Sequence, residues 1–310
     1  MTEGTRRRIG SLVRIGISMG LLVWLLWRFD LKGVWGYFEA LPMSVWATAL
    51  MMYALAQILS SIRWWILATT LSFPGPWPTY LGFYYVGMFF NLFLPTGIGG
   101  DLFKAHFLSR EEGRRFLALF TVVGDRLFGL IAMLILGGGA VILEDGLLPE
   151  PFAGFLKAGS LLVLMGLAGV PLLQRAIDRL WPRISGRLEG LFILWRHPKR
   201  LLFVLGLSFA LQGLGMGAVA LLGRGIGIHL PLAFYFASLP LVGIITLIPV
   251  SFNGIGVREG AFVYFFGLKG IAPEPALGLG LLFFSLQVGL SLVGGMAYAA
   301  GAHRRSIVVK

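Results

Sequence analysis

The 310-residue sequence contains no cysteine, and only 13% of its residues are charged. The lack of cysteine excludes disulfides, thiol nucleophiles and thiolate metal sites. The low charge, beside 57% hydrophobic residues, excludes an ordinary soluble protein, in which about 45–50% of residues are apolar and about 25% are charged. Acidic residues are scarcer than basic ones, 14 against 26, and leave a net charge of +12.

Patterns typical of catalysis are missing as well. The four histidines are scattered along the chain without metal-ligand spacing. The sequence has no phosphate-binding loop and no Gly-x-Ser-x-Gly elbow, and no basic stretch carries a nucleic-acid reader motif. We therefore expect no enzymatic activity, no cofactor or metal, and no nucleic-acid partner.

What the sequence does contain is a series of long apolar segments, each long enough to enter a bilayer core of roughly 30 Å. There are eight, at 12–29, 43–62, 77–108, 116–143, 154–173, 201–222, 231–266 and 276–300. They predict an all-α polytopic membrane protein, with residues 1–310 as a single membrane domain. No small-residue cleavage site follows the first segment, so we interpret it as a spanning helix and not as a signal peptide.

Proline and glycine interrupt two of these segments. The third contains Asn91-Leu-Phe-Leu-Pro-Thr-Gly-Ile-Gly-Gly-Asp101, and the seventh contains Pro249-Val-Ser-Phe-Asn-Gly-Ile-Gly-Val-Arg-Glu-Gly260. Proline breaks the helical hydrogen-bond ladder, and glycine frees the backbone. Each segment is therefore predicted to form two half-helices around an irregular turn, which at membrane depth must be satisfied by protein or water.

The distribution of basic residues favours hairpins over crossings. If all eight segments crossed with the N-terminus inside, 10 basic residues would lie inside and 15 outside, against the positive-inside rule. If the two broken segments turn back as re-entrant hairpins, 19 lie inside, 6 lie outside and Arg126 stays in the membrane. We therefore predict about six full spans, two re-entrant hairpins, and both termini in the cytoplasm.

This arrangement divides the chain into two halves of opposite orientation, at about 10–145 and 154–302. Each would contain two spans, a hairpin and a third span, which is an inverted repeat. Transporters built this way place the substrate at the repeat interface near the midplane. The basic stretch 174–200, between the fifth and sixth apolar segments, is predicted to be an amphipathic cytoplasmic linker, which either binds an anionic membrane surface or only sets the topology.

Ionisable groups inside the membrane cost about 2.5–3.5 kcal/mol each on insertion scales, which makes them candidates for function. We therefore assign the candidate substrate-binding residues to the intramembrane charges and the two breaks. They are Arg63, Asn91, Gly99, Gly100, Asp101, Lys104, Asp125, Arg126, Asn253, Gly254, Gly256, Arg258 and Glu259.

Specific contacts are expected for some of them. Asp101 is expected to cap the second half-helix and to pair with Arg126, while Asp125 is expected to bind a hairpin amide. Arg258, beside a helix N-terminus, suits a phosphate or carboxylate. Arg63, at the cytoplasmic end of the second span, either holds a lipid head group or is a snorkelling anchor. A purely structural N-cap is the alternative for Asp101, and a buried ion-pair network that fixes the fold is the alternative for the Asp125–Arg126 pair.

The run from Asn91 to Asp101, the Asp125-Arg126 pair and the run Asn253-Gly-Ile-Gly-Val-Arg-Glu-Gly260 together resemble the transmembrane region of lysylphosphatidylglycerol synthases, a flippase-like family. The resemblance covers roughly residues 10–300. Some family members fuse this region to a soluble aminoacyl-transferase. Here the chain ends at Lys310, so we expect no synthase domain. Lys104 stands where arginine is expected more often, which keeps the charge and loses the bidentate geometry.

The resemblance implies a lipid translocase of the cytoplasmic (inner) membrane that moves an anionic phospholipid or a lipid-linked head group between leaflets. Two alternatives belong to other classes. One is a non-transporting scaffold for a separate lipid-modifying enzyme or glycosyltransferase, in which the intramembrane charges would tolerate substitution. The other is a membrane enzyme that acts on lipid head groups with paired carboxylates.

Overall fold

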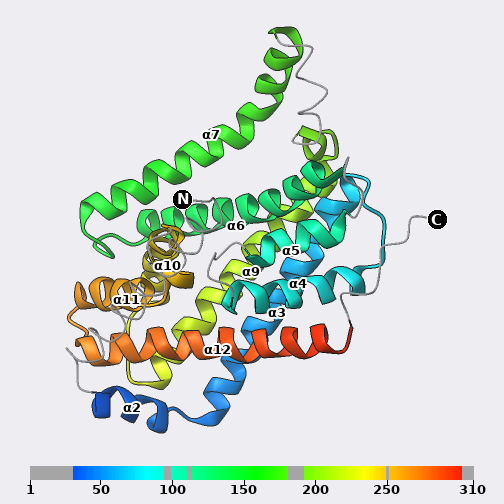
Figure 1. The fold of residues 1–310 in the computed structure, drawn as a ribbon. Coiled ribbons are helices and arrows are strands. Elements are labelled where there is room, and N and C mark those ends of the chain that lie inside the picture. Colours follow the sequence, from blue (N-terminus) through cyan, green and yellow to red (C-terminus); the bar gives the residue numbers. More distant parts are fainter. Residues whose placement is uncertain (1–30, 94–98, 110–113, 181–191, 249–250, 302–310) are drawn as a thin grey trace, which may run out of the picture.

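The computed structural model describes residues 31–93, 99–109, 114–180, 192–248 and 251–301. These residues form helices joined by short turns, and no strand occurs among them. Five helices are long and apolar enough to cross a membrane: α3 (Met43–Thr70), α6 (Arg115–Leu143), α7 (Glu150–Leu180), α9 (Pro198–Gly225) and α12 (Pro273–Ala299) (Figure 1). The predicted all-α polytopic class is confirmed, whereas the predicted first span, 12–29, lies outside the described residues.

The first broken segment forms two helices that run antiparallel. They are α4 (Trp77–Phe93) and α5 (Gly99–Leu108). Near their open ends, the rings of Phe83 and Phe107 lie 5.8 Å apart. Near the turn, the rings of Phe90 and Phe103 lie 4.9 Å apart. The chain therefore returns to the side from which it came, as a hairpin requires.

The second broken segment doubles back in the same way. It comprises α10 (Leu232–Leu247), the short 3-10 turn η3 (Phe252–Gly254) and α11 (Val257–Gly267). Phe234 at the start of α10 stacks edge-on against Phe266 at the end of α11, with ring centroids 5.1 Å apart. Left-handed backbone closes the turn, with φ values of 49° at Asn253, 75° at Gly254 and 83° at Gly256. Asparagine and glycine tolerate this conformation better than other residues.

The two hairpins open at opposite ends of the molecule, which we name the Ala299 end and the Pro273 end after the two ends of α12. Helices α3 and α9 pack antiparallel: Arg200 Nη1 donates to Thr70 Oγ1 at 3.2 Å, while Gly225 packs against Val45. The first hairpin therefore opens beside the Thr70 end of α3, and the second beside the Gly225 end of α9. An inverted repeat requires this opposition, and the repeat itself remains a prediction.

Close contacts at small residues hold the long helices together, as is common among membrane helices. Gly138 on α6 faces Ser160 on α7, whose hydroxyl oxygen lies 2.6 Å from the Leu134 carbonyl oxygen. On the other side of the molecule, a side chain at Gly294 of α12 would press into the Tyr85 carbonyl group of α4. The second contact seats the first hairpin directly against α12.

Helix α7 differs from the other long helices because it has a proline in its interior and packs along little of its length (Figure 1). Pro171 has no N–H, so the carbonyl of Leu167 loses its helical donor. The indole Nε1 of Trp195 supplies one, at 3.1 Å. Trp195 lies in the 3-10 element η2 (Ile193–Arg196), which precedes α9.

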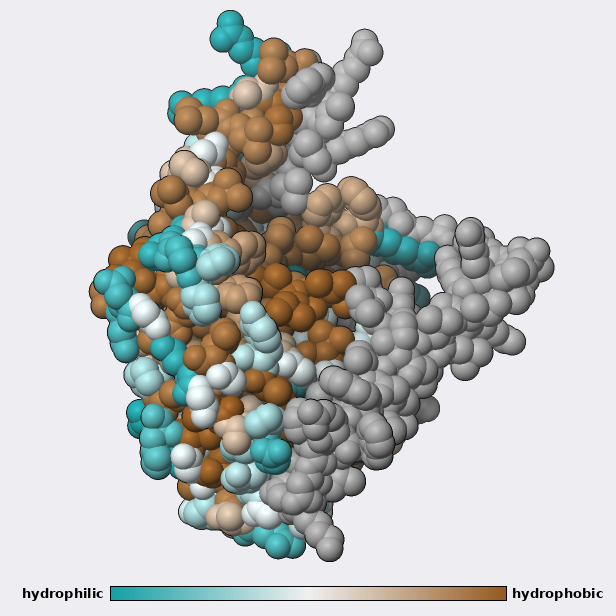
Figure 2. All heavy atoms as spheres, turned by 90° about the vertical axis from the view of Figure 1, so that its left-hand side faces the viewer, coloured by the Kyte–Doolittle hydropathy of each residue, from teal (hydrophilic) through white to brown (hydrophobic). Residues whose placement is uncertain are grey.

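The predicted linker at 174–200 is largely helix where the structure describes it. Helix α7 continues to Leu180, and α9 begins at Pro198. The part of the linker between 181 and 191 lies outside the described residues. A short helix, α2 (Leu31–Ala40), packs against the start of α12, where Tyr37 meets Gly278. Figure 2 looks onto this Pro273 end and shows hydrophilic residues scattered among apolar ones.

Candidate functional site

Five charged side chains from three helices form one continuous chain of alternating sign. Arg63 on α3 donates from Nε to Asp125 Oδ1 on α6 at 2.8 Å, and from Nη1 to Ser208 at 3.0 Å. The Nζ of Lys104 on α5 lies 4.0 Å from Asp125 Oδ2 and 3.1 Å from Asp101 Oδ1. At the far end, Arg126 donates from Nε to Asp101 Oδ2 at 3.0 Å. The expected Asp101–Arg126 pairing is present, whereas among the described residues Asp125 pairs with Arg63 and Lys104 and with no hairpin amide.

Exposure changes along this charge chain. The side chains of Arg63, Asp125 and Lys104 are at most 4% exposed and that of Asp101 is 11% exposed, but that of Arg126 is 56% exposed. Three cations face two carboxylates, so the cluster carries a net charge of +1. Because Lys104 and Arg126 share the carboxylate of Asp101, the excess positive charge belongs to these two cations, and Arg126 is the more accessible of them.

Asn91, and not Asp101, secures the start of α5. The side-chain Oδ1 of Asn91 accepts the backbone N–H of Gly100 at 2.9 Å, across the hairpin turn. Asp101 turns its carboxylate toward Lys104 and Arg126 instead, because two cations outcompete a backbone amide for it. Its Oδ1 has no hydrogen bond of good geometry among the described residues, although Lys104 Nζ lies close by.

The sequence predicts Arg63 at a helix end, but in the structure Arg63 lies within α3. Helix α3 continues to Thr70, seven residues further, which is about two helical turns. The Arg63 side chain is buried and bound to Asp125 and Ser208, so it is neither a snorkelling anchor nor open to a head group. A buried arginine requires such a partner, since an unpaired charge in the interior is very costly.

The second break holds its own ion pair. Arg258 donates to Glu259 Oε1 from Nε at 3.0 Å and from Nη2 at 2.7 Å, and the N–H of Gly256 donates to Glu259 Oε2 at 2.7 Å. Arg258 also donates from Nη1 to Gln287 Oε1 on α12 at 2.8 Å. Both charged side chains are buried and neutralise each other, so Arg258 positions Gln287 and does not face a ligand directly.

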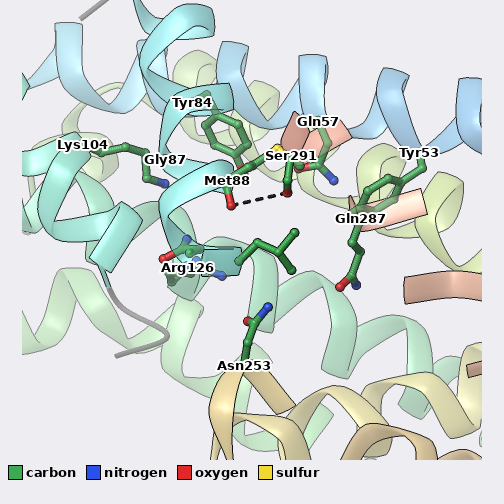
Figure 3. A pocket seen from close by; sticks show the side chains of 12 residues that line it. Tyr53, Gln57, Tyr84, Gly87, Met88, Lys104, Arg126, Asn253, Gln287 and Ser291 are labelled. Atoms are coloured by element: carbon green, nitrogen blue, oxygen red, sulfur yellow. Dashed lines mark hydrogen bonds between the residues drawn. The ribbon is translucent and has the colours of Figure 1, made fainter. Parts of the chain in front are cut away.

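A cavity of about 210 Å³ lies between the two breaks (Figure 3). Side chains from both halves of the chain converge on it, with Asn253 of the second break facing the lining groups of α3, α4 and α12. The lining residues are Tyr53, Gln57, Tyr84, Gly87, Met88, Asn91, Leu92, Lys104, Arg126, Asn253, Gln287 and Ser291.

The cavity sits near the middle of the helices that enclose it. Arg126 is the twelfth of the 29 residues of α6, and Gln287 is the fifteenth of the 27 residues of α12. In a bilayer, charge at mid-depth must face protein or a water-filled space. The arrangement is thus a polar chamber at the depth where polar groups are most costly.

A family model for the lysylphosphatidylglycerol synthase TM region matches residues 11–295. The chain belongs to this family. The resemblance expected from the two breaks and the Asp125-Arg126 pair is thereby confirmed. Comparison with curated proteins and with solved structures finds no match to this chain. Membership supports a multi-pass membrane protein connected with lipid metabolism or transport.

In this member of the lysylphosphatidylglycerol synthase TM region family, the structure brings part of the predicted site together around the cavity. Four of the predicted residues line the cavity: Asn91, Lys104, Arg126 and Asn253. The other predicted residues do not line the cavity; they form the turns beside it or are buried partners of nearby charges. Gly99 and Gly100 begin α5, Gly254 and Gly256 form the second turn, and the remaining predicted charges are the buried partners described above: Arg63, Asp101, Asp125, Arg258 and Glu259. Their role in substrate binding remains a prediction.

The sequence prediction includes Asn91 and Asn253 but misses the other uncharged polar residues that line the cavity. Gln57 on α3 and Gln287 on α12 interrupt otherwise apolar helices, which is a detectable signal because an amide in a membrane helix needs a polar partner or a cavity. Tyr53, Tyr84 and Met88 carry no such signal. No group of three or more histidine or acidic side chains placed to hold a metal ion occurs in the part of the chain that the structure describes.

Proposed function

We propose that this protein is a lipid translocase that moves the head group of an anionic or phosphate-linked lipid through the cavity between the two hairpins. One observation carries the proposal. A mid-depth cavity exposes the guanidinium of Arg126, which belongs to an ion cluster with a net charge of +1, and no carboxylate is among the described residues that line this cavity. An anion entering it would neutralise the net charge of the cluster.

The hydrogen-bonding capacity of Arg126 supports this proposal. A guanidinium has five N–H donors, and Asp101 engages only Nε and Nη2. The remaining donors are available to a phosphate oxygen, which arginine binds well because its planar fork matches phosphate geometry. Lys104 lies beside it and adds a second cation, held over the ring of Tyr84 at 4.6 Å.

The opposed hairpins supply a route to alternating access. In the proposed inverted repeat of about 10–145 and 154–302, α3 to α6 correspond to α9 to α12 in the opposite orientation. Each hairpin contributes one wall of the cavity through Asn91 or Asn253. Movement of one hairpin relative to the other would open the same site to either leaflet, as in transporters with inverted repeats.

Charge at the two ends supports a cytoplasmic Ala299 end. Among the side chains that the structure describes, seven basic residues and one acidic residue lie near this end: Arg114, Arg115, Arg175, Arg179, Arg196, Lys199, Arg200 and Asp178. Near the Pro273 end, five acidic residues face three basic ones: Glu39, Glu144, Asp145, Glu150, Glu274, Lys157, Arg224 and Lys269. By the positive-inside rule, we propose that the protein resides in the cytoplasmic membrane and that its Ala299 end faces the cytoplasm.

Transport in proteoliposomes tests the proposal. Fluorescent phosphatidylglycerol would be followed by dithionite quenching for the unmodified protein, for Arg126→Gln and for Arg126→Lys. Loss of a hydrogen bond to a charged group costs about 1.5–3 kcal/mol, so Arg126→Gln is expected to lower the apparent lipid affinity about 10- to 100-fold. Arg126→Lys is expected to retain part of the activity.

Lys157→Gln is the matched control, because it removes an exposed cation whose only close partner, Glu150, lies at 3.9 Å on the surface. Transport by this control should equal that of the unmodified protein. If Arg126→Gln transports phosphatidylglycerol as fast as the control while remaining folded, the assignment of the site is wrong. If the unmodified protein moves no lipid, the translocase proposal fails.

A further inference from the structure

The polar groups that line the cavity differ in kind from those that support it. Two lining side chains, Lys104 and Arg126, are cationic, and all other polar lining groups are neutral. The carboxylates of Asp101 and Asp125 contact these cations and do not line the cavity. The buried Arg258–Glu259 pair is likewise behind the lining, where it is bound to Gln287. Among the residues that the structure describes, the lining of the cavity therefore offers a ligand positive charge and neutral dipoles, but no negative charge.

A ligand that carries an ammonium group would fit this cavity poorly. Its charge would find no carboxylate and would be repelled by Lys104 and Arg126, in surroundings where charges are weakly screened. Aromatic faces can bind ammonium groups, but Lys104 Nζ already occupies the face of Tyr84. This arrangement disfavours aminoacylated and ethanolamine head groups relative to neutral ones.

Neutral hydroxyl groups, in contrast, would find many partners. Gln57, Asn91, Asn253 and Gln287 each present an amide to the cavity, and an amide both donates and accepts. Among the side chains drawn in Figure 3, the only hydrogen bond runs from Ser291 to the Met88 carbonyl oxygen, at 3.5 Å. The amide oxygens of Asn91 and Gln287 each accept one hydrogen bond from outside the lining, from Gly100 N–H and Arg258 Nη1. Their NH2 groups, and the amides of Gln57 and Asn253, are available to a ligand.

The size of the cavity limits what can bind. Its volume of about 210 Å³ is below the roughly 300–1,000 Å³ of pockets for drug-sized ligands. A phosphate with a short polyol has that scale. Because the cavity is partly open, a longer head group could extend out of it, so the discrimination against aminoacylated lipids rests on charge.

We infer that the cavity is selective for a phosphate esterified to a small neutral polyol, such as glycerol or a single sugar, and discriminates against cationic head groups. In this assignment, Arg126 and Lys104 bind the phosphate, and the four amides bind the hydroxyl groups. The inference rests on the proposed function, whose site it specifies.

Binding to the purified full-length protein in detergent tests the inference without requiring transport. Isothermal titration calorimetry would compare dihexanoyl forms of phosphatidylglycerol, phosphatidic acid, phosphatidylethanolamine and lysylphosphatidylglycerol. We expect phosphatidylglycerol to bind at least tenfold more tightly than either amine-bearing lipid. It should also bind several-fold more tightly than phosphatidic acid, because the latter lacks the polyol.

A charge introduced at one lining residue provides the sharpest variant. Gln57→Glu places a carboxylate in the cavity with nearly unchanged shape, and Gln57→Met is the neutral control. The carboxylate is expected to shift the preference toward phosphatidylethanolamine by tenfold or more relative to phosphatidylglycerol. The methionine variant should weaken phosphatidylglycerol binding several-fold and leave phosphatidylethanolamine unaffected.

The outcomes separate the inference from the proposed function. Equal affinity of the unmodified protein for phosphatidylglycerol and lysylphosphatidylglycerol would overturn the inference and leave the translocase proposal intact. Absence of binding by every phosphate lipid would overturn both. Glycerol 3-phosphate serves as a soluble probe: if it binds as tightly as phosphatidylglycerol, the polyol phosphate assignment stands, and a lipid as its source is wrong.

Discussion

Replacement of Gly100 by alanine should open the first hairpin and disable the site. Gly100 packs against the backbone of Gly87 on α4, and an added Cβ would overlap the Gly87 carbonyl oxygen. It would also lie 2.6 Å from the Gly87 carbonyl carbon and 2.8 Å from Asn91 Cγ. An ordinary van der Waals contact of a Cβ begins at 3.4 Å. The 2.6 Å distance between the added Cβ and the Gly87 carbonyl carbon must therefore grow by at least 0.8 Å, which requires α4 and α5 to move apart.

That separation falls where the site is assembled. The Asn91–Gly100 hydrogen bond spans the same contact, and Lys104 lies one turn further along α5. Overpacking of this kind costs about 1–3 kcal/mol, and a misplacement of about 1 Å can reduce activity roughly 100-fold. We expect Gly100→Ala to lose most lipid binding and transport while it lowers the thermal denaturation midpoint in detergent.

Two alanine variants separate loss of the site from loss of packing. Gly138→Ala would overlap the Ser160 hydroxyl in the α6–α7 contact, away from the cavity, so it should lower stability and leave lipid affinity unchanged. Gly139→Ala meets no atom within 4 Å and should be neutral or stabilising by up to about 1 kcal/mol, from helix propensity. The reasoning is refuted if Gly100→Ala binds lipid like Gly139→Ala, or if Gly138→Ala loses lipid binding to the same extent.

Further predictions concern the buried polar contacts. Asp125→Asn leaves the Arg63 guanidinium buried without its carboxylate and should lower the free energy of unfolding by about 3–5 kcal/mol. The double variant with Arg63→Gln should be less destabilised than Asp125→Asn in the same denaturation experiment, and equal loss would contradict the pairing. Trp195→Phe removes the donor to the carbonyl freed by Pro171 and should cost about 0.5–1.5 kcal/mol. Hydrogen exchange should then rise around Leu167, whereas unchanged exchange there would show that water replaces the indole.

The sequence predicts the fold well wherever the signal is local. The run of apolar residues and the two Pro/Gly breaks place each described long helix and both hairpins to within a few residues, except at the end of α3 and along 174–200. The predicted second span ends too early, because the charge of Arg63 is typical of the end of a membrane span. Its true environment depends on Asp125, which is 62 residues away in the chain. A contact of that range cannot be inferred from local pattern.

The candidate site shows the same division. The presence of a charged side chain in an apolar segment correctly indicates Lys104 and Arg126, which line the cavity. The same criterion also indicates Arg63, Arg258 and Glu259, which are buried in ion pairs outside the lining. Sequence alone does not reveal which cation is neutralised by a neighbour. Nor did it draw attention to Gln57 and Gln287, because uncharged amides stand out less than ionisable groups in an apolar segment.

The turns create the site more than the charges do. If α4 and α5 formed one continuous helix, Lys104 would lie 17 residues beyond Gly87, about 25 Å along the axis. In the hairpin, Lys104 Cγ instead lies 3.1 Å from the position of a Cβ on Gly87. The fold-back thereby carries Lys104 and Asp101 to the depth of Arg126, where each can neutralise another. The second hairpin brings Asn253 to the opposite wall in the same way. Because mutual pairing removes most of the cost of charge at this depth, the protein can keep the guanidinium of Arg126 accessible near the middle of its helices while Asp101 remains its counter-ion.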